Sequence, residues 1–97
     1  MTHEYTDADL VEAAIRREMD ILGDEAAVAL AREIDGLVVE DDGGVASVNR
    51  PVADVLSELV DAYVAESGDI AAFVIARRLA NVVDDPTVLP ENVARHV

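Results

Sequence analysis

The chain contains no cysteine, no lysine and no tryptophan, and its only aromatic residues are Tyr5, Tyr63 and Phe73. The absence of cysteine excludes disulfides, thiolate metal sites and cysteine nucleophiles. No apolar run approaches the roughly 20 residues of a membrane-spanning helix, and no apolar leader stands at the N-terminus. We therefore expect a cytoplasmic protein that neither spans nor binds a membrane.

The 97 residues are 52% hydrophobic, and alanine and valine contribute 16 residues each. A chain of this length and composition can bury one hydrophobic core but not two. We therefore predict a single domain over residues 1–97, with a core of small side chains.

Twenty-one carboxylates face seven arginines, which gives a net charge of -14. Phosphate contacts need clustered cations, so this balance argues against general nucleic-acid binding. The acids are spread along the whole chain, where they repel one another in dilute salt and are screened at molar salt. The pattern favours a protein from a salt-accumulating halophile. The alternative is an acidic interaction protein of an ordinary cell.

Hydrophobic periodicity predicts a mainly helical α+β fold, in which two antiparallel helix pairs flank a small β-hairpin. Thr6 is expected to cap the first helix, with Asp9 completing a capping box. Pro51 fits the first turn of the third helix, and the acidic turn at 41–44 supplies the glycines of a tight hairpin. The predicted elements are helices at about 7–22, 24–35, 50–67 and 69–84, the hairpin at about 37–48, and a loose tail at 86–97.

An internal similarity relates the two halves of the chain. Residues 23–32 and 68–77, which lie 45 positions apart, are identical at six of ten positions. In each half a glycine, Gly23 or Gly68, is expected to end one helix in a left-handed conformation, and the next residue, an aspartate, is expected to cap the second helix. The similarity is consistent with a duplicated αα unit. The alternative is a common helix junction in an alanine-rich chain.

The fourth predicted helix is apolar around its whole circumference from residue 70 to residue 76. Such a helix is buried on more than one side, and four short elements leave little chain to cover it. We therefore predict a homodimer whose interface includes Ile70, Phe73, Val74 and Ile75. The alternative is a central helix enclosed by its own chain.

Arg77 and Arg78 interrupt this apolar helix, and Arg32 is the counterpart of Arg77 in the first half. Guanidinium groups hold oxyanions and carboxylates through paired hydrogen bonds. These three arginines are therefore candidates for contact with an anion or an acidic partner. The alternative is ion pairing within the chain, for example between Arg32 and Asp35.

The sequence shows no catalytic, cofactor-binding or metal-binding motif. His3 and His96 stand near the two ends without a second ligand at helical spacing. The acidic turn at 41–44 lacks the alternating ligands and the final bidentate acid of a calcium loop. No P-loop, dinucleotide fingerprint or nucleophile elbow occurs, and no internal histidine is present to activate a serine. We therefore expect a protein without cofactors and without enzymatic activity.

The segment Glu66-Ser67-Gly68-Asp69-Ile70-Ala71-Ala72 resembles the Glu-x-Gly-Asn-Ile-Gly-Ala helix start of the CheC-type chemotaxis response-regulator phosphatases. In that family the motif occurs in repeated halves, and its Glu and Asn orient the attacking water. The resemblance assigns these two positions to Glu66 and Asp69, so an aspartate replaces the asparagine amide. It covers seven residues, and most of the family's strands have no counterpart in this chain.

These features favour a small non-enzymatic protein that acts through protein–protein contacts, with a regulatory role as one form of such action. A transcription regulator is one alternative, because a hairpin that comes after helices can form a wing. Only two helices precede this hairpin and its tip is acidic, whereas winged domains normally place three helices first. A response-regulator phosphatase, as the resemblance implies, is the other alternative.

Overall fold

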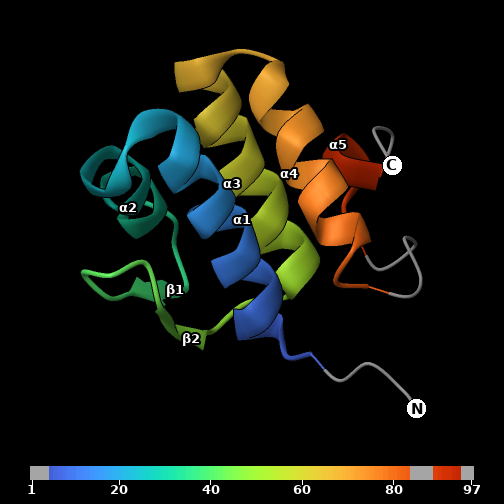
Figure 1. The fold of residues 1–97 in the computed structure, drawn as a ribbon. Helices are drawn as coiled ribbons and strands as arrows, with labels where there is room; N and C mark the ends of the chain where they lie inside the picture. Colours follow the sequence, from blue (N-terminus) through green and yellow to red (C-terminus); the bar gives the residue numbers. More distant parts are fainter. Residues whose placement is uncertain (1–4, 84–88, 95–97) are drawn as a thin grey trace.

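A computed structural model describes residues 5–83 and 89–94 of the chain. Within this part it contains five helices and one two-stranded antiparallel sheet, so the predicted mainly helical α+β class is confirmed (Figure 1). The elements are α1 (Asp7–Leu22), α2 (Asp24–Arg32), β1 (Leu37–Val39), β2 (Val45–Val48), α3 (Val52–Ser67), α4 (Ile70–Ala80) and α5 (Glu91–Ala94).

The long helices α1 and α3 lie side by side in the middle of the molecule (Figure 1). α2 and the hairpin pack on one side of them, and α4 and α5 pack on the other. α1 contacts α2, α3, α4 and β2, so it touches most of the other elements. The hairpin separates the helix pairs in the sequence, but in space it lies at the edge of the molecule, and the two pairs pack directly on each other.

The two helix pairs are structurally equivalent along their first helices. α1 and α3 are each 16 residues long, and their first residues are 45 positions apart. The buried positions correspond at the same offset: Leu10, Val11, Ala14, Ile15 and Glu18 of α1 match Val55, Leu56, Leu59, Val60 and Tyr63 of α3. The internal similarity of the sequence is therefore also a similarity of structure.

α1 has the predicted bounds, but α2 and α3 do not. α2 ends at Arg32 instead of continuing to residue 35, because the next two backbone amides bond to carbonyls three residues back and tighten the turn. α3 begins at Val52 instead of residue 50, because the amide of Asn49 still bonds to the carbonyl of Gly36 and belongs to the hairpin. The predicted capping box between Thr6 and the third helical residue of α1 is confirmed.

α4 ends at Ala80, four residues before the predicted end. The next two amides bond to carbonyls three residues back, and the side-chain amide of Asn81 donates to the carbonyl of Arg77 at 3.2 Å. These bonds satisfy helix-end carbonyls that would otherwise lack partners. The expected stop at Asp84-Asp85-Pro86 lies outside the described residues, as do His3 and His96.

The C-terminal segment is not a loose tail where the structure describes it. α5 contacts α3 and α4, and Leu89 and Val93 are buried. The side-chain amide of Asn92 donates to the carbonyl of Ser57 at 3.0 Å and to a carboxylate oxygen of Asp61 at 3.1 Å. This short helix therefore supplies cover for α4 that the sequence pattern did not reveal.

The hairpin is fixed against α1. A carboxylate oxygen of Glu12 accepts a hydrogen bond from the backbone amide of Val45 at 3.1 Å. Gly43 packs so closely on α1 that a Cβ at this position would lie 2.7 Å from the sulfur of Met19. The tight turn predicted at 41–44 is present, and contacts with α1 set its position.

Both corner glycines have the predicted positive φ, but their ψ is extended instead of helical. The φ and ψ angles are 90° and 157° at Gly23, and 82° and -177° at Gly68. This region is essentially restricted to glycine. Gly23 is itself the N-cap of α2, so the prediction that Asp24 caps this helix is wrong. Asp69 holds the N-cap position of α4 but makes no capping bond through its side chain.

Gly23→Ala and Gly68→Ala should each lower the free energy of unfolding by about 1–3 kcal/mol through backbone strain. No neighbouring atom lies within 4 Å of the Cβ position at either glycine, so steric contact adds nothing. Denaturant titration followed by circular dichroism measures the loss, with Asp24→Ala as the control that keeps the corner glycine. If the control loses as much stability as the glycine variants, backbone strain at the two glycines is not the cause of the loss.

Candidate functional site

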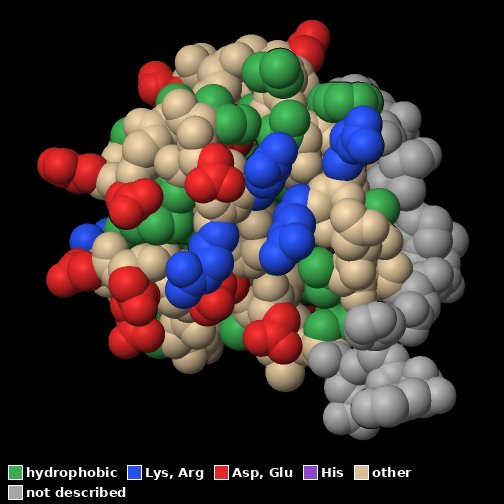
Figure 2. All heavy atoms as spheres, in the orientation of Figure 1, with side chains coloured by type: hydrophobic (Ala, Val, Ile, Leu, Met, Phe, Trp, Pro, Cys, Tyr) green, Lys and Arg blue, Asp and Glu red, His purple; other side chains and the backbone are tan. Residues whose placement is uncertain are grey.

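Four arginines gather on one surface of this acidic molecule. Arg16 and Arg17 lie on α1, and Arg77 and Arg78 lie in the last turn of α4, which packs against α1. Figure 2 shows basic side chains together over these two helices, with acidic side chains over α2 and the hairpin beside them. We call these four residues the arginine face. They are four of the seven arginines in the chain, so positive charge is concentrated where α1 meets α4.

The arginines on α1 each have an acidic neighbour on their own helix. Arg16 bonds to Glu12 at 3.1 Å, and Arg17 lies 3.6 Å from Asp20. These two arginines and their two acidic partners are all substantially exposed, and exposed ion pairs of this kind contribute little to stability. Their guanidinium groups therefore remain available for other partners.

The arginines on α4 are different. Within residues 5–83 and 89–94, no carboxylate lies within ion-pair distance of Arg77 or Arg78. The guanidinium carbon of Arg77 lies 5.7 Å from the centroid of the Phe73 ring, at the spacing of a cation–π contact. Ion pairing, the alternative considered for these two arginines, therefore does not account for them within the described chain.

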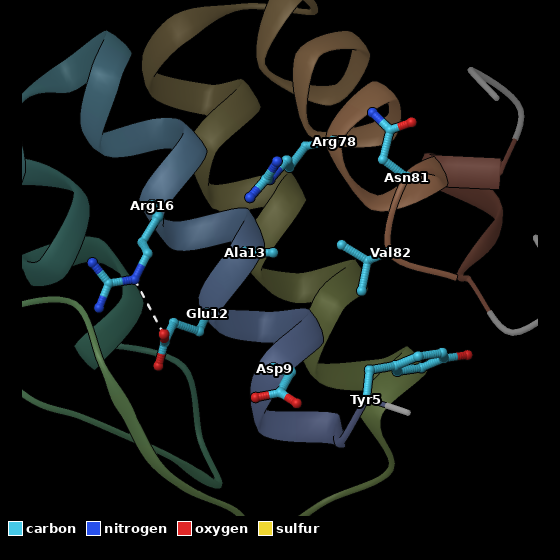
Figure 3. A pocket seen from close by; sticks show the side chains of 8 residues that line it. All are labelled: Tyr5, Asp9, Glu12, Ala13, Arg16, Arg78, Asn81 and Val82. Atoms are coloured by element: carbon cyan, nitrogen blue, oxygen red, sulfur yellow. Dashed lines mark hydrogen bonds and ion pairs between the residues drawn. The ribbon is translucent and has the colours of Figure 1, made fainter. Parts of the chain in front are cut away.

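Two neighbouring hollows lie along the arginine face. The smaller has a volume of about 260 Å³ and is lined by Arg17, Val74, Arg77, Arg78 and Asn81. The larger, of about 390 Å³, is lined by Tyr5, Asp9, Glu12, Ala13, Arg16, Arg78, Asn81 and Val82 (Figure 3). In that view Arg78 extends from α4 over the side of α1, while Arg16 turns toward Glu12. Arg78 and Asn81 line both hollows and therefore join them.

Arg32 lies elsewhere and has a structural role. Its Nε donates to the carbonyl of Val39 at 3.1 Å, and its Nη2 bonds to Asp41 at 2.6 Å. The expected pairing with Asp35 is not the one formed, because α2 ends at Arg32 and the hairpin folds back beside it. Arg32 clamps the hairpin onto α2 and does not belong to the arginine face.

The four apolar residues predicted at an interface have different environments. Ile75 is 0% exposed and lies in the core of the protomer, whereas Ile70 is 59% exposed and Phe73 is 44% exposed. Val74 is half-buried and lines the smaller hollow. Because α1, α3 and α5 cover the inner side of α4, Ile70 and Phe73 lie on its outer side, and Val74 lies between the two sides.

A buried carboxyl group lies between α1 and α3, and no sequence motif pointed to it. Glu18 is 0% exposed, its Oε1 accepts from the hydroxyl of Ser67 at 3.1 Å, and its Oε2 has no hydrogen-bond partner among the described residues. Burial raises the pKa of Glu18, and the bond from Ser67 opposes this shift only in part. The hydroxyl of Tyr63 donates to the carbonyl of Ala27 at 2.8 Å, and burial raises the pKa of Tyr63 as well.

Helical spacing in the sequence could have indicated two of the residues described above, Glu18 and Asn81. Glu18 follows Val11, Ala14 and Ile15 in an i, i+3, i+4, i+7 series, which places it on the buried side of its helix. Asn81 is three residues from Arg78 and therefore near the same side of α4. Arg17 gave no local signal, since its place in the hollow depends on the packing of α1 against α4.

The structure also shows the hairpin that suggested a transcription regulator and the segment that resembles the phosphatases. The hairpin loop carries acidic residues, and it is held to α1 and α2 by Glu12 and Arg32. Glu66 and Asp69, the residues of the phosphatase-like segment, are both exposed where α3 meets α4, and Ile21 is the counterpart of Glu66 in the first half. Among the described residues no group of three or more metal-ligating side chains occurs.

The chain matches no protein-family model, and no curated protein or solved structure is significantly similar to it. In the part of the chain that the structure describes, no helix has both the length and the apolar character needed to cross a membrane.

Proposed function

We propose that this chain is a small, non-enzymatic cytoplasmic protein of a halophile that acts through protein–protein contacts, with a regulatory role, and that it forms a homodimer through the surface over α1 and α4. The observation that carries this proposal is the combination of exposed apolar residues on α4 with the arginine face beside them. Apolar anchors next to arginines are typical of contact surfaces.

Charge complementarity favours a second copy of the chain as the partner. The surface shown in Figure 2 carries its arginines over α1 and α4 and its carboxylates over α2 and the hairpin. A two-fold axis between these regions would place each arginine region opposite the acidic region of the other copy, because such an interface uses the same surface twice. Ile70 and Phe73 would contribute apolar area to this contact.

Ile70→Asp should weaken dimerisation at least roughly 30-fold, the effect of losing a central anchor residue, and should leave the helices intact. The substitution places a charge on an exposed position, so folding of the protomer does not depend on it. Light scattering and sedimentation in molar salt measure the association, and circular dichroism checks the helix content.

Ala65→Asp is the matched control, because Ala65 is exposed on α3, outside the proposed contact, and the variant gains the same charge. The control should dimerise as the wild type does. Equal weakening by both substitutions would contradict the α4 surface as the interface. A wild-type protein that stays monomeric from micromolar to millimolar concentration would overturn the homodimer.

A further inference from the structure

We infer that the smaller hollow of the arginine face is a binding site for a doubly charged tetrahedral oxyanion of the phosphate type. The hollow brings together Arg17 from α1 with Arg77 and Arg78 from α4. This inference goes beyond the proposed function, because it concerns a small ion and not a protein partner.

The charge of the smaller hollow favours an anion. The chain has three carboxylates for every arginine, and Arg32 and Arg50 each hold an acid outside their own element, Asp41 and Glu58. Arg77 and Arg78 have no such acid within the described residues, although they stand beside a third cation, Arg17. Three neighbouring guanidinium groups repel one another, and an anion between them removes that repulsion.

The end of α4 does not account for this cluster by itself. The C-terminus of a helix carries about half a negative elementary charge, which favours cations in the last turn. Arg77 and Arg78 together exceed that charge, and Arg17 comes from the middle of another helix. A net positive site therefore remains.

The side chains that line the hollow also favour an oxyanion. Guanidinium groups donate paired hydrogen bonds that match the oxygens of phosphate. Asn81 uses its side-chain amide on the carbonyl of Arg77, which leaves a second N–H of the same group for an anion. A volume of about 260 Å³ lies below the roughly 300–1,000 Å³ of sites for larger organic ligands and leaves room for a phosphate-sized anion.

Thermal unfolding with added inorganic phosphate tests this site. Potassium chloride keeps the ionic strength equal in all samples, so that general screening does not differ between them. At phosphate concentrations well above the dissociation constant, the melting temperature of the wild type should rise by a few degrees. Arg78→Gln and Arg17→Gln should each abolish most of this rise, and Arg50→Gln, which removes an arginine paired with Glu58, should retain it.

Isothermal titration calorimetry should give one phosphate per chain for the wild type and none for Arg78→Gln. No rise in Ile70→Asp, whose arginines no second copy covers, or an equal rise in the wild type and Arg78→Gln, would overturn the site. An equal rise with acetate would overturn its preference for a doubly charged anion. In the proposed dimer the acidic region of the other copy faces these arginines and competes with the anion, so Ile70→Asp should bind phosphate at least as tightly as the wild type. Loss of the homodimer and loss of this site are therefore separate results.

Discussion

Ile75→Asp should unfold the protein. Ile75 is 0% exposed in the middle of α4, where α1, α3 and α5 surround the helix. Loss of a buried isoleucine side chain costs about 2–5 kcal/mol, and burial of an unpaired carboxylate adds several more. Because domains of this size have about 5–15 kcal/mol of stability in total, the variant should lose most or all of it.

Circular dichroism in molar salt measures this effect through the loss of helix signal and of a cooperative melting transition. Ile70→Asp is the control on the same helix, since it adds the same group at a position that is 59% exposed. A folded, helical Ile75→Asp protein that is only monomeric would contradict the placement of Ile75 inside the protomer, and would return this residue to the interface.

Glu18→Gln should raise the free energy of unfolding at pH values above the raised pKa of Glu18, by on the order of 1–3 kcal/mol, because a neutral amide avoids the extra cost of burying an ionised carboxylate without a full set of hydrogen-bond partners. Burial raises the pKa of Glu18 in the folded protein above its usual value of about 4.3. Below that usual value the carboxyl is protonated in both states. As pH rises toward the folded pKa, the unfolded state binds fewer protons than the folded state, so the wild type loses stability. Glutamine does not titrate.

Denaturant titrations at several pH values measure this difference. The curves of the wild type and Glu18→Gln should approach each other near pH 4 and separate as pH rises. Glu66→Gln, on the exposed side of α3, removes the same charge from the net total and serves as the control. If both variants gain the same stability, relief of general repulsion and not the buried carboxyl is the cause.

Local signals were sufficient for much of the fold. The capping box at Thr6 and the stop at Gly23 define both ends of α1, because a cap and a helix-ending glycine act within a few residues. The 45-residue similarity correctly related the two helix pairs. The errors at the ends of α2 and α4 arose because apolar spacing continues past the last α-helical bond into a tightened turn.

The candidate site depended on contacts that local patterns do not contain. Arg78 was a candidate from its sequence position, but Arg17 joins it only because α1 and α4 pack together. Arg32 looked equivalent to Arg77, yet the hairpin supplies it with partners from residues seven and nine positions away. The packing of α5 on α4 likewise was not predicted, because the sequence pattern indicated this segment only as a loose turn.

The equivalence of the two helix pairs allows matching surface positions to be compared. Arg32 and Arg77 occupy matching positions, but their helices lead into different segments of the chain. After α2 the chain folds back as a hairpin, and Arg32 holds it in place through hydrogen bonds to the carbonyl of Val39 and to Asp41. Within the described residues no hairpin lies beside Arg77, and its guanidinium is exposed next to Phe73. The two halves therefore bury matching positions, whereas one and the same surface position holds the chain together in the first half and faces solvent among the described residues of the second.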